Sequence, residues 1–169
     1  SPTTASDVFE DMNGRIPLII DGGECQAGLE STVVSVLSDT PIILRPGVIT
    51  KEMISDVLNK NVEVANAVTK GVEKNEQVLS PGMKYKHYAP KAQVIILNGE
   101  IEKFIQYVNT HKTDKTYVLC FENEQHLFNL PTITFGHEND ASSQAKKLFS
   151  ALRKLDSTNA ELVFARCPE

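Results

Sequence analysis

The chain is poor in cysteine: its 169 residues include only Cys25, Cys120 and Cys167, and it has no tryptophan. Thiols this few and this widely spaced exclude a disulfide framework and a paired Cys-x-x-Cys metal site. They favour a reducing compartment, so we expect a cytoplasmic protein. No apolar run approaches the roughly 18 residues that span a bilayer, and no signal-peptide pattern opens the chain, so we expect no membrane contact.

Basic residues are not in excess either, since 17 Lys and Arg stand against 22 Asp and Glu, giving a net charge of -5. This balance gives no support to a nucleic-acid coat. Hydrophobic residues make up 41% of the chain, which suffices for a packed core and excludes a disordered or fibrous protein. A P-loop is absent, and the glycines at 22, 23 and 28 do not form a dinucleotide-binding fingerprint, because no helix is predicted after them.

The residues before about position 80 are rich in glycine and β-branched side chains. They predict strands at 17–20, 31–36 and 41–45, the first of them buried. A helix is expected after a cap at Thr3 or Thr4, with Val8 and Met12 on one face. A second is expected over 51–60, where Thr50 is the cap and the apolar stripe consists of Met53, Ile54, Val57 and Leu58.

After residue 90, strands and helices alternate. Strands are predicted at 93–97, 117–121, 132–135 and 162–165. Between them, the spacing predicts an amphipathic helix from Ile101 to Val108 and a helix capped by Asp140 with Leu148 and Leu152 on its apolar face. The chain is therefore predicted to be an α/β protein that ends in a mainly parallel, doubly wound sheet.

The run Ser80–Pro90 holds two prolines, a glycine and no apolar periodicity, and predicts a linker. Its lysines and His87 lie among Tyr85 and Tyr88. Cations interleaved with aromatic rings can contact the phosphates and the base of a nucleotide. The alternative is a solvated linker whose tyrosines pack on the adjoining domains, and the run alone favours that alternative.

Two polar features lie at predicted strand ends. Glu30, Ser31 and Thr32 place a carboxylate and two hydroxyls at a strand start, where they can hold a polar ligand. Arg45 ends a strand, and a guanidinium there can bind a phosphate or carboxylate in bidentate fashion. Alternatively, the hydroxyl residues only favour a strand and Arg45 is a solvated charge; spacing alone favours this second interpretation.

The remaining candidates are weaker. Cys120 falls inside an apolar strand and is predicted to belong to the core. Cys25 lies in a glycine-rich turn without a basic neighbour that would lower its pKa. The histidines at 111, 126 and 137 have no partner at metal-ligand spacing, so surface positions are expected for them.

Taken together, four motifs resemble the second half of the YrdC-type domain: Ser1–Ala5, Ile19–Gly23, Glu30–Val34 and Ile43–Gly47. Ser80–Pro90 resembles the linker of the longer, two-domain threonylcarbamoyl-AMP synthases. The resemblance implies a partial YrdC-type catalytic domain at 1–79, a linker at 80–90 and a Rossmann-like C-terminal domain at 91–169.

The family's upstream basic and Ser-x-Asn motifs are not in this sequence and would lie before Ser1. The last strand and helix of the C-terminal domain are also expected to be missing. By this resemblance the chain is an internal piece of a longer protein, which we call the parent protein. The piece alone is expected to be inactive.

The resemblance further implies a nucleotidyltransferase that condenses L-threonine, bicarbonate and ATP into threonylcarbamoyl-AMP and pyrophosphate, for tRNA threonylcarbamoyladenosine modification. Ser1, Arg45 and Tyr88 would contact ATP, and Ser31 would contact threonine; the linker would close over the nucleotide as a lid. No catalytic side chain and no metal ligand is assigned, and whether Mg²⁺ accompanies ATP stays open. Expected partners are the transferase proteins that use the product, with tRNA contact also open.

Two other functions compete with this one. YrdC-type domains have been viewed as RNA-binding surfaces, so a double-stranded-RNA or tRNA-binding module is the alternative. The acidic net charge of -5 weighs against it, because RNA affinity comes largely from neutralising phosphates. A regulatory or scaffolding α/β domain is the third hypothesis.

Overall fold

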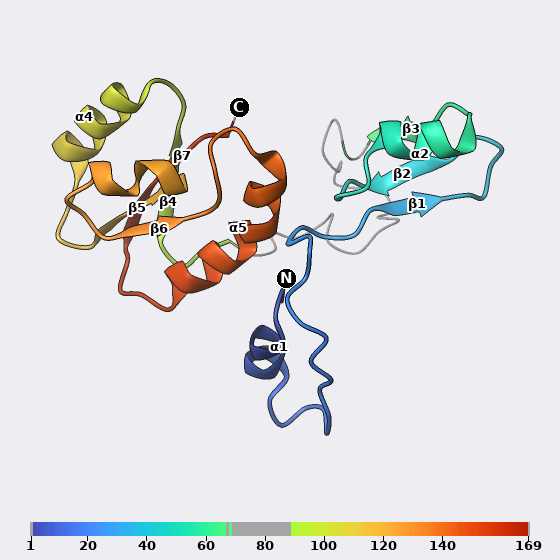
Figure 1. The fold of residues 1–169 in the computed structure, drawn as a ribbon, viewed down its shortest axis with the longest axis horizontal. Helices are drawn as coiled ribbons and strands as arrows, with labels where there is room; N and C mark the ends of the chain where they lie inside the picture. Colours follow the sequence, from blue (N-terminus) through green and yellow to red (C-terminus); the bar gives the residue numbers. More distant parts are fainter. Residues whose placement is uncertain (1, 67, 69–88, 169) are drawn as a thin grey trace. The chain divides into compact units, whose positions relative to one another are not determined.

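The computed structural model describes residues 2–66, 68 and 89–168. The chain divides into two compact units: residues 1–28 together with 88–169, here called the larger unit, and residues 29–87, the smaller unit (Figure 1). The linker predicted at 80–90 lies almost wholly outside the described residues, so it stays a prediction.

The larger unit is built on a four-stranded sheet with the order β4-β7-β5-β6. All three strand pairs are parallel, which confirms the predicted α/β class and the parallel sheet. Each strand was predicted to within one residue at either end. The strands are β4 (Gln93–Leu97), β5 (Thr116–Cys120), β6 (Thr132–Thr134) and β7 (Leu162–Arg166).

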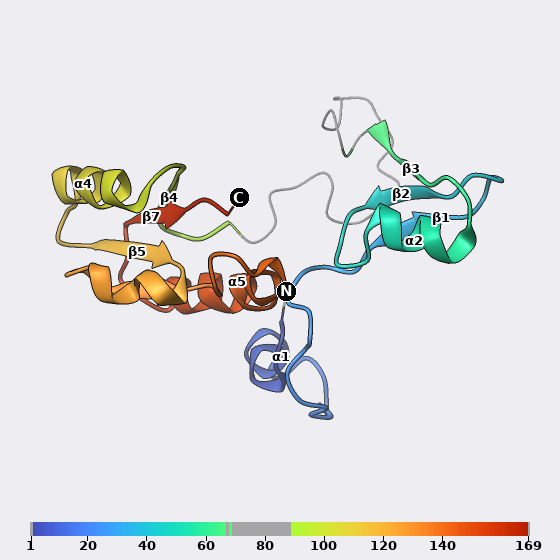
Figure 2. The same ribbon diagram turned by 45° about the horizontal axis from the view of Figure 1, so that its top comes forward.

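Two helices, α4 (Ile101–His111) and α5 (Ala141–Asp156), cover opposite faces of this sheet. Phe104 of α4 packs with Val118, Cys120 and Phe164. Leu155 of α5 packs with the intervening strand residues Leu119, Val163 and Ala165. Since successive strand residues point to opposite faces, the helices lie on different sides, as Figure 2 shows.

Local signals explain where these helices begin. The Asp140 side chain accepts a hydrogen bond from the Ser143 backbone NH at 3.0 Å, as expected of an N-cap. The 3-10 helix η1 (Glu122–Leu127), between β5 and β6, was not predicted, because its polar sequence lacks apolar periodicity. Within the described residues, no helix is both long and apolar enough to cross a membrane.

The start of the larger unit forms the helix α1 (Ala5–Met12). Thr4 caps it, and the Asp7 carboxylate in turn accepts the Thr4 NH at 3.1 Å. The buried strand predicted at 17–20 is wrong: no strand is assigned there, and the side chains of Leu18 and Ile20 are 72% and 84% exposed. A strand requires a neighbouring strand, and none of the described strands pairs with this run.

The smaller unit holds a three-stranded sheet of β1 (Val33–Ser35), β2 (Ile42–Arg45) and β3 (Glu63–Val64). The β1–β2 pair is antiparallel and the β2–β3 pair is parallel. The helix α2 (Lys51–Leu58) begins after its Thr50 cap, as predicted. Its predicted apolar stripe is largely exposed, however, because Met53, Val57 and Leu58 are 53%, 86% and 45% exposed.

Candidate functional site

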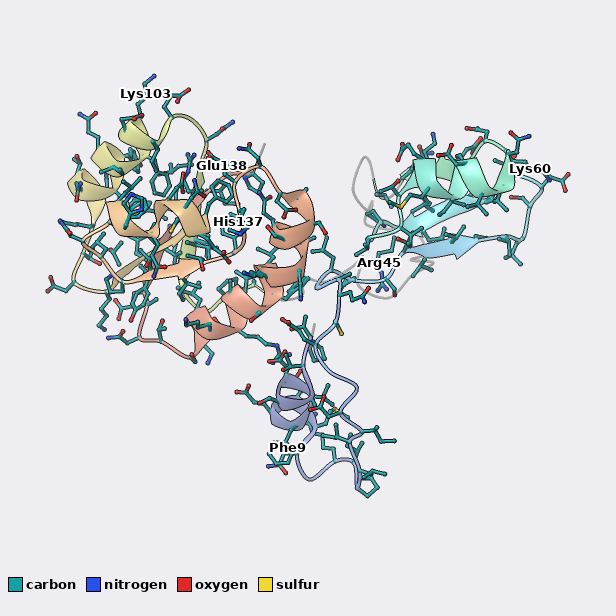
Figure 3. All side chains as sticks on the ribbon, in the orientation of Figure 1. Phe9, Arg45, Lys60, Lys103, His137 and Glu138 are labelled. Carbon is teal, nitrogen blue, oxygen red and sulfur yellow. The ribbon has the colours of Figure 1, made fainter. Side chains whose placement is uncertain are left out.

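The candidate site lies where β1 begins and β2 ends. Arg45 is the last residue of β2 and pairs with Val33, the first residue of β1. An irregularity in the register follows Val33, which locally bends the pair. This antiparallel register brings Ser31, two residues before β1, next to the Arg45 side chain, which Figure 3 labels.

The Arg45 guanidinium is held against Ser31 by three hydrogen bonds. Nε and Nη2 donate to the Ser31 carbonyl oxygen at 3.1 and 3.0 Å, and Nη2 also donates to Ser31 Oγ at 3.1 Å. A Glu30 carboxylate oxygen lies 3.9 Å from Nε. The side chains of Arg45 and Glu30 are 20% and 28% exposed, so this cluster is partly shielded from water.

Gly47 allows the chain to pass closely over the cluster. A Cβ at this position would lie 2.3 Å from the Glu30 carbonyl oxygen and 2.5 Å from the Thr32 nitrogen, so no side chain fits there. The Thr32 hydroxyl also donates to the Ile49 carbonyl oxygen at 2.7 Å, which ties the two segments together. The sequence showed Gly47 only as part of a strand-ending Pro-Gly pair, and its packing role was missed.

Of the four residues predicted to bind ligands, the structure brings Ser31 and Arg45 together. Ser1 and Tyr88 lie outside the described residues, as do Tyr85 and His87 of the predicted lid. A guanidinium beside a hydroxyl can hold an anionic oxygen together with a neighbouring polar group of one ligand. The cluster therefore has the chemistry of an anion-positioning site.

The histidines at 111, 126 and 137 are exposed, as expected. The His137 ring lies 3.2 Å from a carboxylate oxygen of Glu122. Among the described residues, no group of three or more His, Cys, Asp and Glu side chains is arranged to hold a metal ion.

A second polar feature is a cavity of about 420 Å³ at the carboxyl ends of β4, β5 and β7. Arg166, which no motif in the sequence indicates as functional, lies at this cavity and is only 7% exposed. Its guanidinium donates to Glu124 at 2.9 Å, to the Gly99 carbonyl oxygen at 2.6 Å and to Glu138 at 3.3 Å. Ligands often bind outside the carboxyl ends of parallel strands. Here, however, all three of these hydrogen-bond acceptors of Arg166 belong to the protein itself. We therefore assign Arg166 to holding the strand ends together.

The cysteines differ sharply in environment. Cys120 is fully buried, which confirms its predicted core position. Burial, with a smaller contribution from the Glu124 charge, raises the pKa of its thiol to about 12. Cys25 is exposed.

We expect iodoacetamide at pH 8 to modify Cys25 readily and to leave Cys120 unmodified in the folded protein. The reactive species is the thiolate, and Cys120 is both inaccessible and protonated at this pH. Peptide mass spectrometry after a timed exposure would measure the labelling of each cysteine. Labelling of Cys120 at a rate comparable with that of Cys25 would contradict its burial in the sheet, and labelling in urea provides the positive control.

Two family models match the sequence. One, described as threonylcarbamoyl-AMP synthase, C-terminal domain, matches residues 49–169. The other, for the Sua5, YciO and YrdC proteins and described as telomere recombination, matches residues 1–47. Together they extend over nearly the whole chain.

Named relatives agree with these models. The chain is 36% identical over 168 residues to a threonylcarbamoyl-AMP synthase of Bacillus subtilis, a match that covers 98% of the chain and 47% of the relative. It is 37% identical over 177 residues to the Schizosaccharomyces pombe protein of the same name, covering 96% of the chain and 43% of that relative. The chain thus spans about half the length of the curated relatives it matches.

A solved structure also resembles this one. The crystal structure of Pyrococcus abyssi Sua5 complexed with L-threonine superposes with a TM-score of 0.81 at 33% sequence identity. The similarity covers 100% of this chain and 49% of that one. Both units of the fold therefore have a counterpart in that protein.

Proposed function

Because this chain belongs to the threonylcarbamoyl-AMP synthase family, we propose that its parent protein is a nucleotidyltransferase that makes threonylcarbamoyl-AMP. The substrates are L-threonine, bicarbonate and ATP, and pyrophosphate is released. The product supplies the threonylcarbamoyl group for modification of tRNA. The contact between Arg45 and Ser31 is the single observation on which we base the role of this chain.

The proposed reaction needs few chemical groups from the protein. The threonine amine combines with bicarbonate to give a carbamate and water. A carbamate oxygen then attacks the α-phosphorus of ATP, and the bond to the pyrophosphate leaving group breaks. Catalysis of such a step depends mainly on positioning the anions and neutralising phosphate charge, for which a shielded guanidinium beside a hydroxyl is suited.

We assign Arg45 to an ATP phosphate and Ser31 to threonine. The two side chains touch at 3.1 Å, so the two substrates would meet at their contact. The bound L-threonine in the Pyrococcus abyssi structure supports a threonine site in this family. Ser1 and Tyr88 are proposed as further ATP contacts, and any Mg²⁺ would enter with ATP as part of the substrate.

The proposed setting is the cytoplasm, with product passed to tRNA-modifying transferase proteins. The RNA-binding alternative has no support from the charge of the chain, which is -5. A pull-down of tRNA by the parent protein at increasing salt would separate that alternative from the enzyme.

Incubation of the parent protein with ATP, L-threonine and bicarbonate tests the proposal. We expect threonylcarbamoyl-AMP, identified by mass spectrometry, and an equal amount of pyrophosphate. Omission of threonine or bicarbonate should abolish both products. Release of pyrophosphate at the same rate without threonine, or an absence of the adenylate, would contradict the proposed function.

A further inference from the structure

Residues 2–28, here called the opening segment, belong to the same compact unit as the parallel sheet and its helices. The two family models divide the chain elsewhere, between residues 47 and 49. The opening segment is thus matched by the catalytic-domain model, while α5 is matched by the C-terminal-domain model. Contacts between the opening segment and α5 therefore join the regions that the two family models match.

Close contacts between described residues form this junction. Both terminal nitrogens of Arg153 donate to the Asp11 carboxylate, at 3.0 and 2.5 Å. Lys146 Nζ lies 3.2 Å from Glu24. Gly28 approaches the backbone of α5 so closely that a Cβ would lie 2.1 Å from the Lys146 carbonyl oxygen.

The contact residues occupy one face of α5. Lys146 and Arg153 are seven residues apart, about two helical turns, and so lie above one another. Ala151 and Leu155 belong to the core cluster and lie on the opposite side of the helix. The helix therefore packs on the sheet with one face and on the opening segment with the other.

The junction is polar. A cavity of about 470 Å³ lies along it, lined by side chains that include Asp7, Glu10, Asp156 and Lys154. The hydrogen bonds from Arg153 hold the pKa of Asp11 below its usual range, so the ion pair is formed at neutral pH. A contact of paired charges sets position and orientation more than it adds buried apolar area.

The opening segment is closed on itself, so a contact at one point fixes the rest. The Cys25 backbone NH donates to the Thr3 carbonyl oxygen at 2.9 Å, which joins the end of the loop to its beginning. Thr3 is 3% exposed, and its NH donates to Asp7 at 2.8 Å. The segment held by α5 at residues 11, 24 and 28 thus also has a fixed start.

We propose that the outward face of α5 is a docking surface for the opening segment, through which the C-terminal domain positions the ATP-binding part of the catalytic domain. This inference rests on the proposed function, in which Ser1 contacts ATP from the start of that segment. Arg153 and Asp11 are then positioning residues that act on ATP through the segment. The C-terminal domain is assigned a role in catalysis without touching a substrate.

Charge exchange in the parent protein tests the proposal. Arg153→Asp and Asp11→Arg are each expected to raise the KM for ATP about tenfold, the size of one charge-assisted contact, with a smaller change in kcat. The double variant Asp11→Arg/Arg153→Asp should restore the KM to within about threefold, because the pair is re-formed with its charges exchanged. The KM for ATP of the conservative variant Arg153→Lys should lie between the values for wild type and Arg153→Asp.

Lys103→Asp is the matched control. Lys103 is exposed on α4, points away from the sheet (Figure 3) and makes no ion pair within the described part of the chain. We expect a wild-type KM for ATP in this variant. A rise equal to that of Arg153→Asp would show a general charge effect and would overturn the proposal.

Amide hydrogen exchange of residues 5–12 reports docking independently of activity. We expect faster exchange there in the single variants and restored protection in the double variant. Unchanged exchange, faster exchange with an unchanged KM, or a raised KM that the double variant does not restore would each overturn the proposal. If the wild type forms no threonylcarbamoyl-AMP, the proposed function fails, while the exchange experiment still decides whether α5 docks the segment.

Discussion

Replacing Arg166 by methionine is expected to lower the free energy of unfolding by about 3–5 kcal/mol, the range measured when one partner of a buried ion pair is removed. The side chains of Arg166 and Glu124 are 7% and 4% exposed, so the Glu124 carboxylate would stay buried without its partner. The Gly99 carbonyl oxygen would lose its donor as well. Urea denaturation of the parent protein would measure the loss.

The double variant Arg166→Met/Glu124→Gln is the control for this mechanism. Glutamine removes the unpaired charge and keeps an oxygen that can accept from the Phe121 NH, as Glu124 does at 3.3 Å. Recovery of at least half of the lost stability is expected, because removing both charges is far less costly than removing one. A single variant within about 1 kcal/mol of wild type would contradict the assigned role of Arg166.

The single variant should also respond to pH in a defined direction. Burial already raises the pKa of Glu124, and Arg166 opposes that effect. Without Arg166 the pKa in the folded state moves further above its value in the unfolded chain, so the folded state holds the proton more strongly. The contribution of Glu124 to the stability of Arg166→Met is therefore fully present below the pKa of this group in the unfolded chain, and it is lost as the pH rises through the raised pKa of the folded state.

Much of the larger unit could be predicted because its signals are local. The strand β4 was predicted with both its ends, and the Asp140 cap located the start of α5. The role of Arg166 could not be predicted in this way. Its partners Glu124 and Gly99 are 42 and 67 residues away, and only the parallel strand order brings their loops together.

Burial was harder to predict than secondary structure. Thr50 and the apolar spacing correctly predicted α2, yet Val57 is 86% exposed. Likewise, Leu18 and Ile20 lie in an apolar run that the sequence alone indicates as a strand. Both cases have one cause: periodicity reports which residues share a face, whereas burial depends on what packs against that face.

For the candidate site, the sequence identified the residue types but not their contact. Ser31 and Arg45 each lie at a predicted strand end, 14 residues apart. Their meeting depends on the antiparallel register of β1 and β2, with Arg45 opposite Val33. Gly47 lets its own segment pass close to the backbone of residues 30–32, and this role could be recognised only from the backbone atoms that it approaches.

Arg45→Lys in the parent protein is expected to weaken ATP binding by about one to two orders of magnitude. Lysine keeps the charge but loses the planar, two-pronged geometry. A hydrogen bond to a charged group contributes roughly 1.5–3 kcal/mol, which corresponds to this range of affinity. The measurement is calorimetric titration of the variant with ATP. Lys60→Ala, at an exposed lysine that Figure 3 labels in the same unit, should leave ATP affinity unchanged.

The contact between Arg45 and Ser31 leads to a second expected result, which concerns the affinity for threonine. If Ser31 binds threonine alone, threonine affinity measured without ATP should be insensitive to Arg45. Because three hydrogen bonds hold Ser31 to the guanidinium, however, we expect Arg45→Lys to weaken threonine binding as well, by roughly twofold to tenfold. If Arg45→Lys and Arg45→Ala both bind ATP and threonine with wild-type affinity, Arg45 is an ordinary, partly exposed charge and binds neither ligand. A loss for ATP with no change for threonine would retain the phosphate contact and reject the coupling of the two substrates through Ser31.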